Sequence, residues 1–285
     1  MEGYVPRTLE EALEIKAAHH DAVPVAGGTD LMVEVNARRK TPAALLDLSR
    51  VDELREWGRE NGSLRIGAGV TFARIARELR SHAALAQAAL SVGAPEIRTR
   101  ATLGGNLATA SPAGDALLPL AAGDAEVLVA AAGGARRSVR WREFLRGPKQ
   151  NALEPDELIT GVRFAVADGP GAFAKVGPRN ANVIAVAGVC VQLDEAVRRV
   201  RVALGSVAPT IVRASDAEIF AAAVIDWDGG SVLGETSLQR FAELVAASAS
   251  PIDDLRGSAT YRRLVVGALA RRLLAQTLGE RETRC

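Results

Sequence analysis

The distribution of apolar and polar positions changes along the chain and divides it into regions of different predicted architecture. Thr8 stands where a helix cap is expected, and the apolar residues after it recur at helical spacing, which predicts an amphipathic helix over residues 8–19. Short apolar runs at 23–26 and 45–48 predict strands. A helix that begins at Thr29, between these strands, completes a small βαβ unit.

The region after residue 55 has the pattern of antiparallel hairpins. Asn61-Gly62 lies between two segments with strand-like alternation, which is a strong hairpin signal, and Gly133-Gly134 separates two further segments of this kind. Between and after the hairpins, the pattern predicts helices that begin near Thr71, Ser81, Asp115 and Trp141, and extended segments over 97–100 and 158–164.

The last third of the chain predicts a separate α+β unit. Gly169-Pro170-Gly171 combines a helix breaker with two flexible positions and is the best candidate for a linker. Three apolar segments follow it, and helical periodicity dominates after them, which predicts a three-stranded antiparallel sheet with helices packed on one side. The predicted strands cover 172–176, 183–193 and 197–206, and the predicted domains are 1–168, with subdomains of about 1–54 and 55–168, and 169–285.

Composition limits the class of protein. The chain has 285 residues, of which 48% are hydrophobic and 24% charged, so a packed globular core is expected. Its net charge of +1 offers no electrostatic surface for nucleic acid. The chain begins without the pattern of a signal peptide and contains no apolar run of about 18 residues. We therefore expect no membrane span and a cytoplasmic location.

Few side chains are suited to catalysis by the protein itself. The three histidines fall in predicted helices, no Gly-x-Ser-x-Gly motif occurs, and no residues have the spacing of metal ligands. The two cysteines, Cys190 and Cys285, are too few for an iron–sulfur cluster, which needs about four thiolates. These absences favour a protein in which a bound cofactor performs the chemistry.

Two glycine-rich segments each follow an apolar run. The first glycine segment is residues 25–30, and the second glycine segment is residues 101–115, whose glycines and hydroxyl side chains are expected to disfavour a helix. Bare backbone lets N–H groups approach phosphate oxygens closely. Although a pair of glycines is common in ordinary turns, two such segments together favour a site for one dinucleotide. The Gly-x-Gly-x-x-Gly motif of Rossmann domains is absent.

These segments resemble those of a known family. The paired FAD-pyrophosphate loops in the flavin subunit of molybdenum hydroxylases are similar to Ala26-Gly27-Gly28-Thr29-Asp30 and Thr102-Leu103-Gly104-Gly105-Asn106. That family includes the carbon monoxide dehydrogenase medium subunit and the xanthine dehydrogenase FAD domain. The resemblance continues at 109–115, 175–179 and 256–262 and covers nearly the whole chain. It implies a two-part FAD-binding domain of the PCMH type, followed by a C-terminal flavoprotein domain of the CO dehydrogenase medium subunit type.

The resemblance also implies roles for individual residues. The backbone of the two glycine pairs would hold the FAD pyrophosphate, and Asp30 is expected to turn away from it and to bond backbone. Lys175 would lie beside the isoalloxazine, where a cation favours reduced flavin. The residues implied to contact FAD are Val25, Ala26, Gly27, Gly28, Thr29, Asp30, Leu31, Ala101, Thr102, Gly104 and Gly105, then Asn106, Thr109, Ser111 and Asp115 at sugar or phosphate oxygens, Leu158 and Ile159 beside a ring system, and Lys175.

The function implied by the resemblance is electron transfer within a larger enzyme. A large molybdopterin-binding subunit would oxidise the substrate, and a small 2Fe-2S subunit would pass electrons to the FAD of this chain, in a dimer of heterotrimers. NAD, a quinone or oxygen would be the final acceptor. Two alternatives remain open: a nucleotide-binding or scaffold protein without redox activity, and a stand-alone flavin oxidase of the vanillyl-alcohol type.

Overall fold

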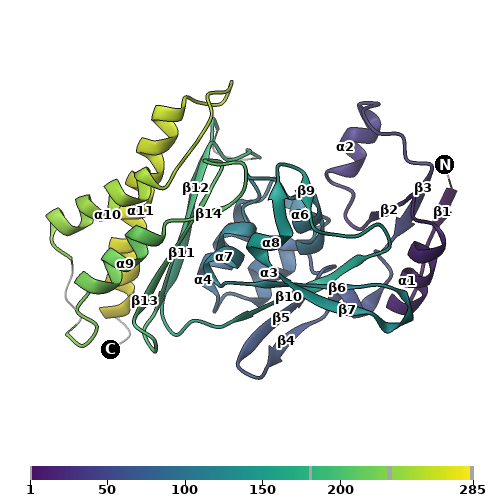
Figure 1. Ribbon diagram of the computed structural model, residues 1–285, viewed down its shortest axis with the longest axis horizontal. Helices are drawn as coiled ribbons and strands as arrows, with labels where there is room; N and C mark the ends of the chain where they lie inside the picture. The colour runs from purple at the N-terminus through teal and green to yellow at the C-terminus, as the bar shows by residue number, and fades with distance from the viewer. Residues whose placement is uncertain (1, 180–181, 230–232, 283–285) are drawn as a thin grey trace. The chain divides into compact units, whose positions relative to one another are not determined.

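The chain folds into two compact units, each assembled from separated stretches of sequence. The computed structural model (Figure 1) describes residues 2–179, 182–229 and 233–282, so Cys285 lies outside the described residues. The first unit comprises Met1–Ile75, Ala94–Ala110 and Asp124–Ala165, and the second comprises Ala76–Gly93, Ser111–Gly123 and Val166–Cys285.

The first unit begins with a three-stranded parallel sheet that contains the predicted βαβ unit. The sheet has the strand order β1-β3-β2. The Oγ1 atom of Thr8 accepts a hydrogen bond from the Glu11 N–H at 3.2 Å, which confirms the predicted cap of the first helix. The elements are β1 (Glu2–Tyr4), which was not predicted, α1 (Leu9–Ala18), β2 (Ala22–Val25), α2 (Leu31–Asn36) and β3 (Ala44–Asp47).

An antiparallel sheet of five strands forms the larger part of the first unit. Its order is β4-β5-β10-β6-β7. The two predicted hairpins, β4–β5 and β6–β7, therefore flank the central strand β10, which follows both of them in the sequence. Asn61 and Gly62 both have positive φ, +50° and +77°, as a tight hairpin turn requires. The strands are β4 (Trp57–Glu60), β5 (Ser63–Gly67), β6 (Glu126–Ala130), β7 (Arg136–Arg140) and β10 (Leu158–Ala165).

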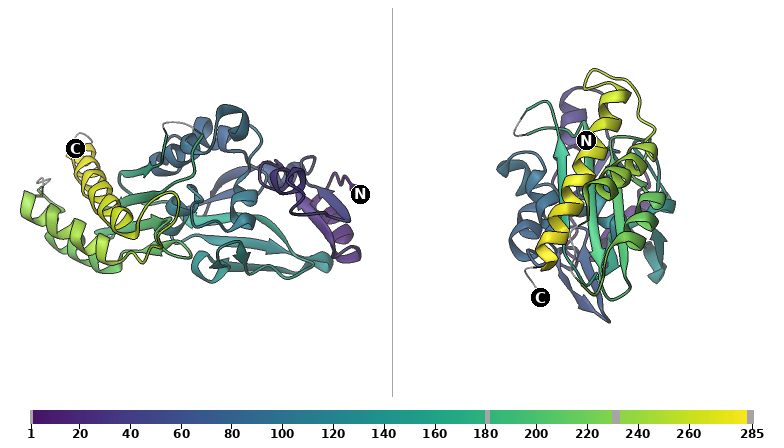
Figure 2. Two further views of the ribbon diagram at one scale, coloured as in Figure 1. Left: turned by 90° about the horizontal axis from the view of Figure 1, so that it is seen from above. Right: turned by 90° about the vertical axis from the view of Figure 1, so that its left-hand side faces the viewer.

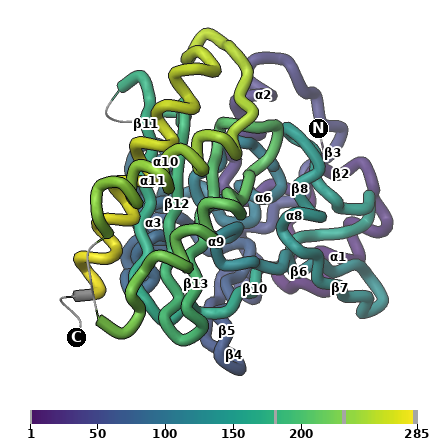
Figure 3. The backbone as a smooth tube through the Cα atoms, turned by 60° about the vertical axis from the view of Figure 1, so that its left-hand side comes forward, coloured from purple at the N-terminus to yellow at the C-terminus, as the bar shows by residue number. Residues whose placement is uncertain are grey.

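Short helices and one small hairpin connect these strands. Residues 97–100 were predicted to be extended, but the chain forms a helical turn there, because Pro95 at the first helical position presets the helical φ. The β8–β9 hairpin lies beside α6 (Figure 3). The connecting elements are η1 (Asp52–Arg55), α3 (Phe72–Glu78), which begins in the first unit, α5 (Pro95–Arg98), α6 (Leu103–Thr109), η2 (Ala132–Gly134), α8 (Trp141–Phe144), β8 (Leu145–Gly147) and β9 (Gln150–Asn151).

The second unit is built on an antiparallel sheet with the order β11-β12-β13-β14. The prediction of three strands was therefore incomplete, since the two-residue β14 adds a fourth. Cys190 is buried in β12, and burial raises the pKa of its thiol to about 12, as expected for an unreactive structural cysteine. The strands are β11 (Gly171–Val176), β12 (Ala187–Asp194), β13 (Arg199–Gly205) and β14 (Val212–Arg213).

Helices cover both faces of this sheet, whereas the sequence predicted helices on one side only. Figure 2 shows α11 running along one face, where α9 and α10 also pack. On the other face, α4 and α7 contact β11, β12 and β13. Gly188 and Gly205 lie against Leu118 of α7, and a methyl group at Gly205 would come within 2.7 Å of it. The helices are α4 (Ala83–Ser91), α7 (Leu117–Ala122), α9 (Ser215–Val224), α10 (Glu235–Ala247) and α11 (Ala259–Glu282).

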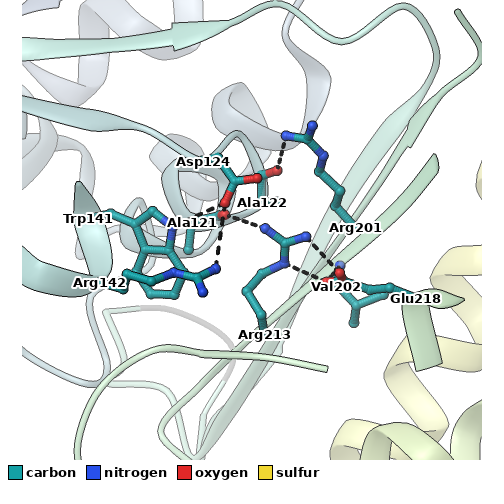
Figure 4. Close-up of polar contacts among 9 residues, drawn as sticks. All are labelled: Ala121, Ala122, Asp124, Trp141, Arg142, Arg201, Val202, Arg213 and Glu218. Carbon is teal, nitrogen blue, oxygen red and sulfur yellow. Dashed lines mark hydrogen bonds and ion pairs between the residues drawn. The ribbon is translucent and has the colours of Figure 1, made fainter. Parts of the chain in front are cut away.

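Arginine side chains of β13 and β14 bind the C-terminal end of α7 in the second unit. Arg201 donates to the Ala122 carbonyl at 3.2 Å, and Arg213 donates to the Ala121 carbonyl at 3.1 Å (Figure 4). Arg213 also forms two hydrogen bonds with the carboxylate of Glu218. These contacts satisfy carbonyls that a helix end leaves without a partner.

Among the helices of the described residues, none combines the length and apolar character that a membrane span requires.

Candidate functional site

The first glycine segment connects the end of β2 with the start of α2 and leaves a row of backbone donors open. Within the described part of the chain, no group accepts a hydrogen bond from the backbone N–H of Gly27, Gly28, Thr29 or Asp30. The backbone φ of Gly28 is +71°, a value that residues with a Cβ atom rarely adopt. Consecutive N–H groups without internal partners are suited to bind an anion, because they carry partial positive charge.

The second glycine segment was expected to avoid helical structure, but residues 103–109 form α6. The Oγ1 atom of Thr102 accepts a hydrogen bond from the Gly105 N–H at 3.1 Å and caps this helix. Gly104 packs on Ala68, where an added Cβ would come within 2.6 Å of the alanine methyl. Tertiary packing that only glycine permits therefore outweighs the low helix propensity of the sequence.

The backbone donors at the start of α6, in the second glycine segment, are used inside the protein. The Gly104 N–H donates to the Ala68 carbonyl at 2.8 Å, and the Leu103 N–H donates to the Val70 carbonyl at 3.0 Å. Together with the capping bond of Gly105, these contacts occupy the first N–H groups of α6. The N–H groups of Gly104 and Gly105 therefore have partners inside the protein, and their predicted contact with the FAD pyrophosphate stays a prediction.

Within the first unit, the structure brings the first glycine segment together with residues 101–110 of the second. Gly27 lies directly against the peptide bond that follows Arg100, so closely that an added Cβ would stand 1.9 Å from the Arg100 carbonyl oxygen. The Thr109 hydroxyl donates to the Oδ2 atom of Asp30 at 2.8 Å. The expectation that the Asp30 side chain bonds to the backbone was wrong, because its carboxylate is hydrogen-bonded to the side chain of Thr109 in α6. The predicted juxtaposition of the two segments is present.

Asn106 provides a second feature that fits a polar ligand. It lies in α6, between the capped first turn and Thr109, and its Oδ1 atom is buried without a hydrogen-bond partner in the described residues. Buried polar atoms in proteins almost always have a partner, so an orphan of this kind is typical of a ligand position. The open donors of residues 27–30 and the acceptor of Asn106 together fit the phosphate and hydroxyl groups of FAD.

Other predicted residues of the first unit have mixed environments. Thr29 is partly exposed within the row of open donors, whereas Ala101 and Thr102 are buried beneath α6. Leu158 and Ile159 are buried in β10, with 2% and 7% of their surface exposed. Val25 ends β2, Ala26 is partly buried after it, and Leu31 begins α2. Contact of these residues with FAD stays a prediction.

Lys175 and Asp115 form a buried ion pair in the second unit. The Lys175 ammonium donates to Asp115 Oδ2 at 2.5 Å, to the Ser91 carbonyl at 2.8 Å and to the Val183 carbonyl at 3.1 Å. All three of its donors are thereby used. The Ser91 hydroxyl also donates to Asp115 at 2.9 Å. Burial raises the pKa of Asp115, while the neighbouring ammonium favours its charged form.

These contacts give Asp115 and Lys175 a structural role in the second unit, where they join α4, the start of α7 and β11. Ser111 belongs to the same unit, and its Oγ accepts a hydrogen bond from the Ala113 N–H at 3.2 Å. The predicted contacts of Ser111, Asp115 and Lys175 with the flavin stay predictions. In the described residues, no group of three His, Cys, Asp or Glu side chains is arranged to hold a metal ion.

Sequence reasoning did not identify the contribution of the β8–β9 hairpin. The Lys149 ammonium pairs with Glu34 of α2 at 3.0 Å, and the Asn151 amide donates to the Ala108 carbonyl of α6 at 2.8 Å. The hairpin thus contacts both helices that follow the glycine segments. The Gly147-Pro148 dipeptide is a turn signal in the sequence, but no local pattern indicates which distant helices such a turn would join.

The fold and the juxtaposed glycine segments define a protein suited to bind a dinucleotide without a Rossmann domain. Comparison with known proteins identifies the family. Residues 1–165 match the family described as "FAD binding domain in molybdopterin dehydrogenase", and residues 172–277 match the "CO dehydrogenase flavoprotein C-terminal domain". The chain belongs to this family of FAD-binding subunits and is an oxidoreductase subunit of the molybdenum hydroxylase type.

Individual relatives agree with this assignment. The nicotinate dehydrogenase FAD-subunit of Eubacterium barkeri is 37% identical over 68% of this chain and 70% of its own length. The nicotine 6-hydroxylase medium subunit of Paenarthrobacter nicotinovorans is 30% identical over 95% of both chains. The solved structure of reconstituted CO dehydrogenase from Oligotropha carboxidovorans contains a chain with a TM-score of 0.88 and 26% identity, over 98% of both chains. The resemblance seen in the sequence is thereby confirmed.

Proposed function

We propose that this chain is the FAD-carrying, electron-transferring subunit of a multi-subunit molybdenum hydroxylase. The observation that carries the proposal is the row of open N–H donors at residues 27–30, held against the second glycine segment in a chain of the FAD-binding family. The pyrophosphate of FAD would bind to these donors, and Asn106 would accept a hydrogen bond from a sugar hydroxyl. Bound FAD would supply the conversion between one-electron and two-electron transfer.

The chain's own residues would bind and orient this cofactor rather than act on the substrate. Family membership over nearly the full length supports the electron-transfer proposal over a scaffold without redox activity and over a stand-alone oxidase. A large molybdopterin-binding subunit would select and oxidise the substrate. A small 2Fe-2S subunit would deliver the electrons, in a cytoplasmic dimer of heterotrimers that reduces NAD, a quinone or oxygen.

Isolation of the tagged full-length chain from its native host tests the assembly. We expect FAD, iron and molybdenum to purify together in fixed ratios, with the iron and molybdenum in two other polypeptides. Isolation of the chain with FAD but with neither metal would contradict the electron-transfer role. Isolation without FAD would contradict the cofactor assignment as well.

A pair of glycine variants tests the position of the cofactor. Gly28 and Gly62 have similar positive φ values, +71° and +77°, so valine causes similar backbone strain at both positions. We expect Gly28→Val to lower the FAD content of the purified protein, while Gly62→Val leaves it unchanged. Equal FAD content in the two variants would place the pyrophosphate elsewhere.

A further inference from the structure

Asp30 combines two properties that oppose each other at the proposed FAD site. Its backbone N–H is one of the open donors of the first glycine segment, and its carboxylate is an exposed anion in the same residue. A carboxylate near a pyrophosphate is repelled, so binding alone does not explain an acidic residue here. The carboxylate instead accepts a hydrogen bond from the Thr109 hydroxyl at 2.8 Å.

The Thr109 hydroxyl can make this bond because it lies at the last residue of α6. Its oxygen is also 2.9 Å from the Gly105 carbonyl, within the same helix. A hydroxyl has one hydrogen to donate, and a charged carboxylate is a stronger acceptor than a carbonyl. The bond to Asp30 is therefore the favoured one, and it connects two segments that are 79 residues apart.

The C-terminal end of α6, where Thr109 lies, is also held by a different element. The Lys149 N–H donates to the Ala110 carbonyl at 3.2 Å, and the Asn151 amide donates to the Ala108 carbonyl at 2.8 Å. These bonds fix α6 to the β8–β9 hairpin. The bond between Asp30 and Thr109 then fixes the first glycine segment to α6, so the spacing of the open donors from Asn106 depends on it.

We propose that Asp30 is a positioning residue that holds the first glycine segment against α6 through Thr109, and that its charge limits the affinity of the site for FAD. This inference rests on the proposed binding of the FAD pyrophosphate at residues 27–30. The two effects have opposite signs. A substitution that removes the charge of Asp30 but keeps its hydrogen-bond acceptor distinguishes the positioning effect from the charge effect.

The test measures the affinity of the FAD-depleted full-length chain for FAD by titration, at low salt and at about 1 M salt. Asp30→Asn keeps an oxygen that can accept from Thr109, so we expect affinity to rise about fivefold at low salt, as removal of one nearby like charge predicts. Because salt screens charges, this gain should shrink at high salt. Glu60→Gln, at the tip of the β4–β5 hairpin, serves as the control for net charge and should leave affinity unchanged.

Removal of the hydroxyl should have the opposite effect. We expect Thr109→Val to weaken FAD binding about tenfold at both salt concentrations, as loss of a hydrogen bond to a charged group predicts. Thr109→Ser keeps the hydroxyl and should restore affinity. The melting temperature of the FAD-free protein should be the same in all variants, since the bond is at the surface.

Three results would overturn the inference. Weaker FAD binding by Asp30→Asn would show that the charge assists the site. Wild-type affinity in Thr109→Val would show that the bond positions nothing, and a parallel loss of melting temperature would reduce its role to stability. A wild-type chain that binds no FAD would refute the proposed function itself, which distinguishes the two failures.

Discussion

Replacement of Gly27 by alanine tests directly whether the two glycine segments must touch. The added Cβ would stand 1.9 Å from the Arg100 carbonyl oxygen and 2.9 Å from the Ala101 nitrogen. Both neighbours are backbone atoms, which cannot rotate away as a side chain can. The segments must separate by about 1.5 Å to restore an ordinary contact of 3.4 Å. Such a movement is large enough to break the 2.8 Å hydrogen bond between Asp30 and Thr109.

The expected cost follows from the kind of overlap. Overpacking of this type destabilises proteins by about 1–3 kcal/mol. For a protein of this size, that corresponds to a decrease in melting temperature of about 2–4 °C for each kcal/mol. Gly27 does not have the positive φ that favours glycine, so the entire effect comes from steric overlap. The proposed site also predicts a loss of bound FAD, because the donors move away from Asn106.

Gly58→Ala is the matched control for this substitution. Gly58 lies in β4, with no atom within 4 Å of an added Cβ. The control should change the melting temperature little, since alanine reduces the entropy of the unfolded chain without strain. Thermal unfolding of both variants without FAD, followed by measurement of FAD content, checks the reasoning. If Gly27→Ala matched Gly58→Ala in both measurements, the close contact of the segments would be refuted.

Two further substitutions test the buried pair and the helix cap. Lys175→Met leaves the Asp115 carboxylate buried without its cation, which should cost about 3–5 kcal/mol near neutral pH. Burial raises the folded-state pKa of Asp115. The free energy of unfolding of this variant should therefore fall as the pH rises from about 4 through that pKa. Urea unfolding at several pH values checks this trend, and a loss of stability that does not depend on pH would contradict it. Thr102→Ala removes the cap of α6 and should cost about 1 kcal/mol, while Thr102→Ser retains the cap; equal thermal unfolding of the two variants would exclude a capping role.

Local sequence patterns predicted much of the fold, because the βαβ unit and the hairpins depend on neighbouring residues. The cap at Thr8 and the turn at Asn61-Gly62 both act over a few positions. The α6 helix was missed because glycine disfavours an isolated helix, whereas the contact between Gly104 and Ala68 is a tertiary constraint. The placement of α4 and α7 on the far face of the C-terminal sheet was missed because it also depends on tertiary contacts rather than on the local sequence.

The candidate site was predictable in part. The pairing of the glycine segments follows from composition, since both combine glycine with small polar side chains. The partners of Asp30 and Lys175 could not be predicted, because each lies far away in the sequence. Charge alone indicated that Asp30 would avoid a pyrophosphate. It did not indicate that Thr109 would supply the alternative partner.

The two glycine segments differ in their open backbone donors, and this difference explains why the proposed site needs both. Gly27 and Gly104 lack side chains because the protein's own atoms fill the space, at Arg100 and at Ala68. Open donors lie at residues 27–30 of the first segment, while the N–H groups of Leu103, Gly104 and Gly105 in the second are bonded internally. In the proposed site, the first segment therefore binds the anion and the second supports it. A substitution at Thr109 of the second segment should therefore act on FAD affinity through position, whereas Asn106 would contact FAD itself.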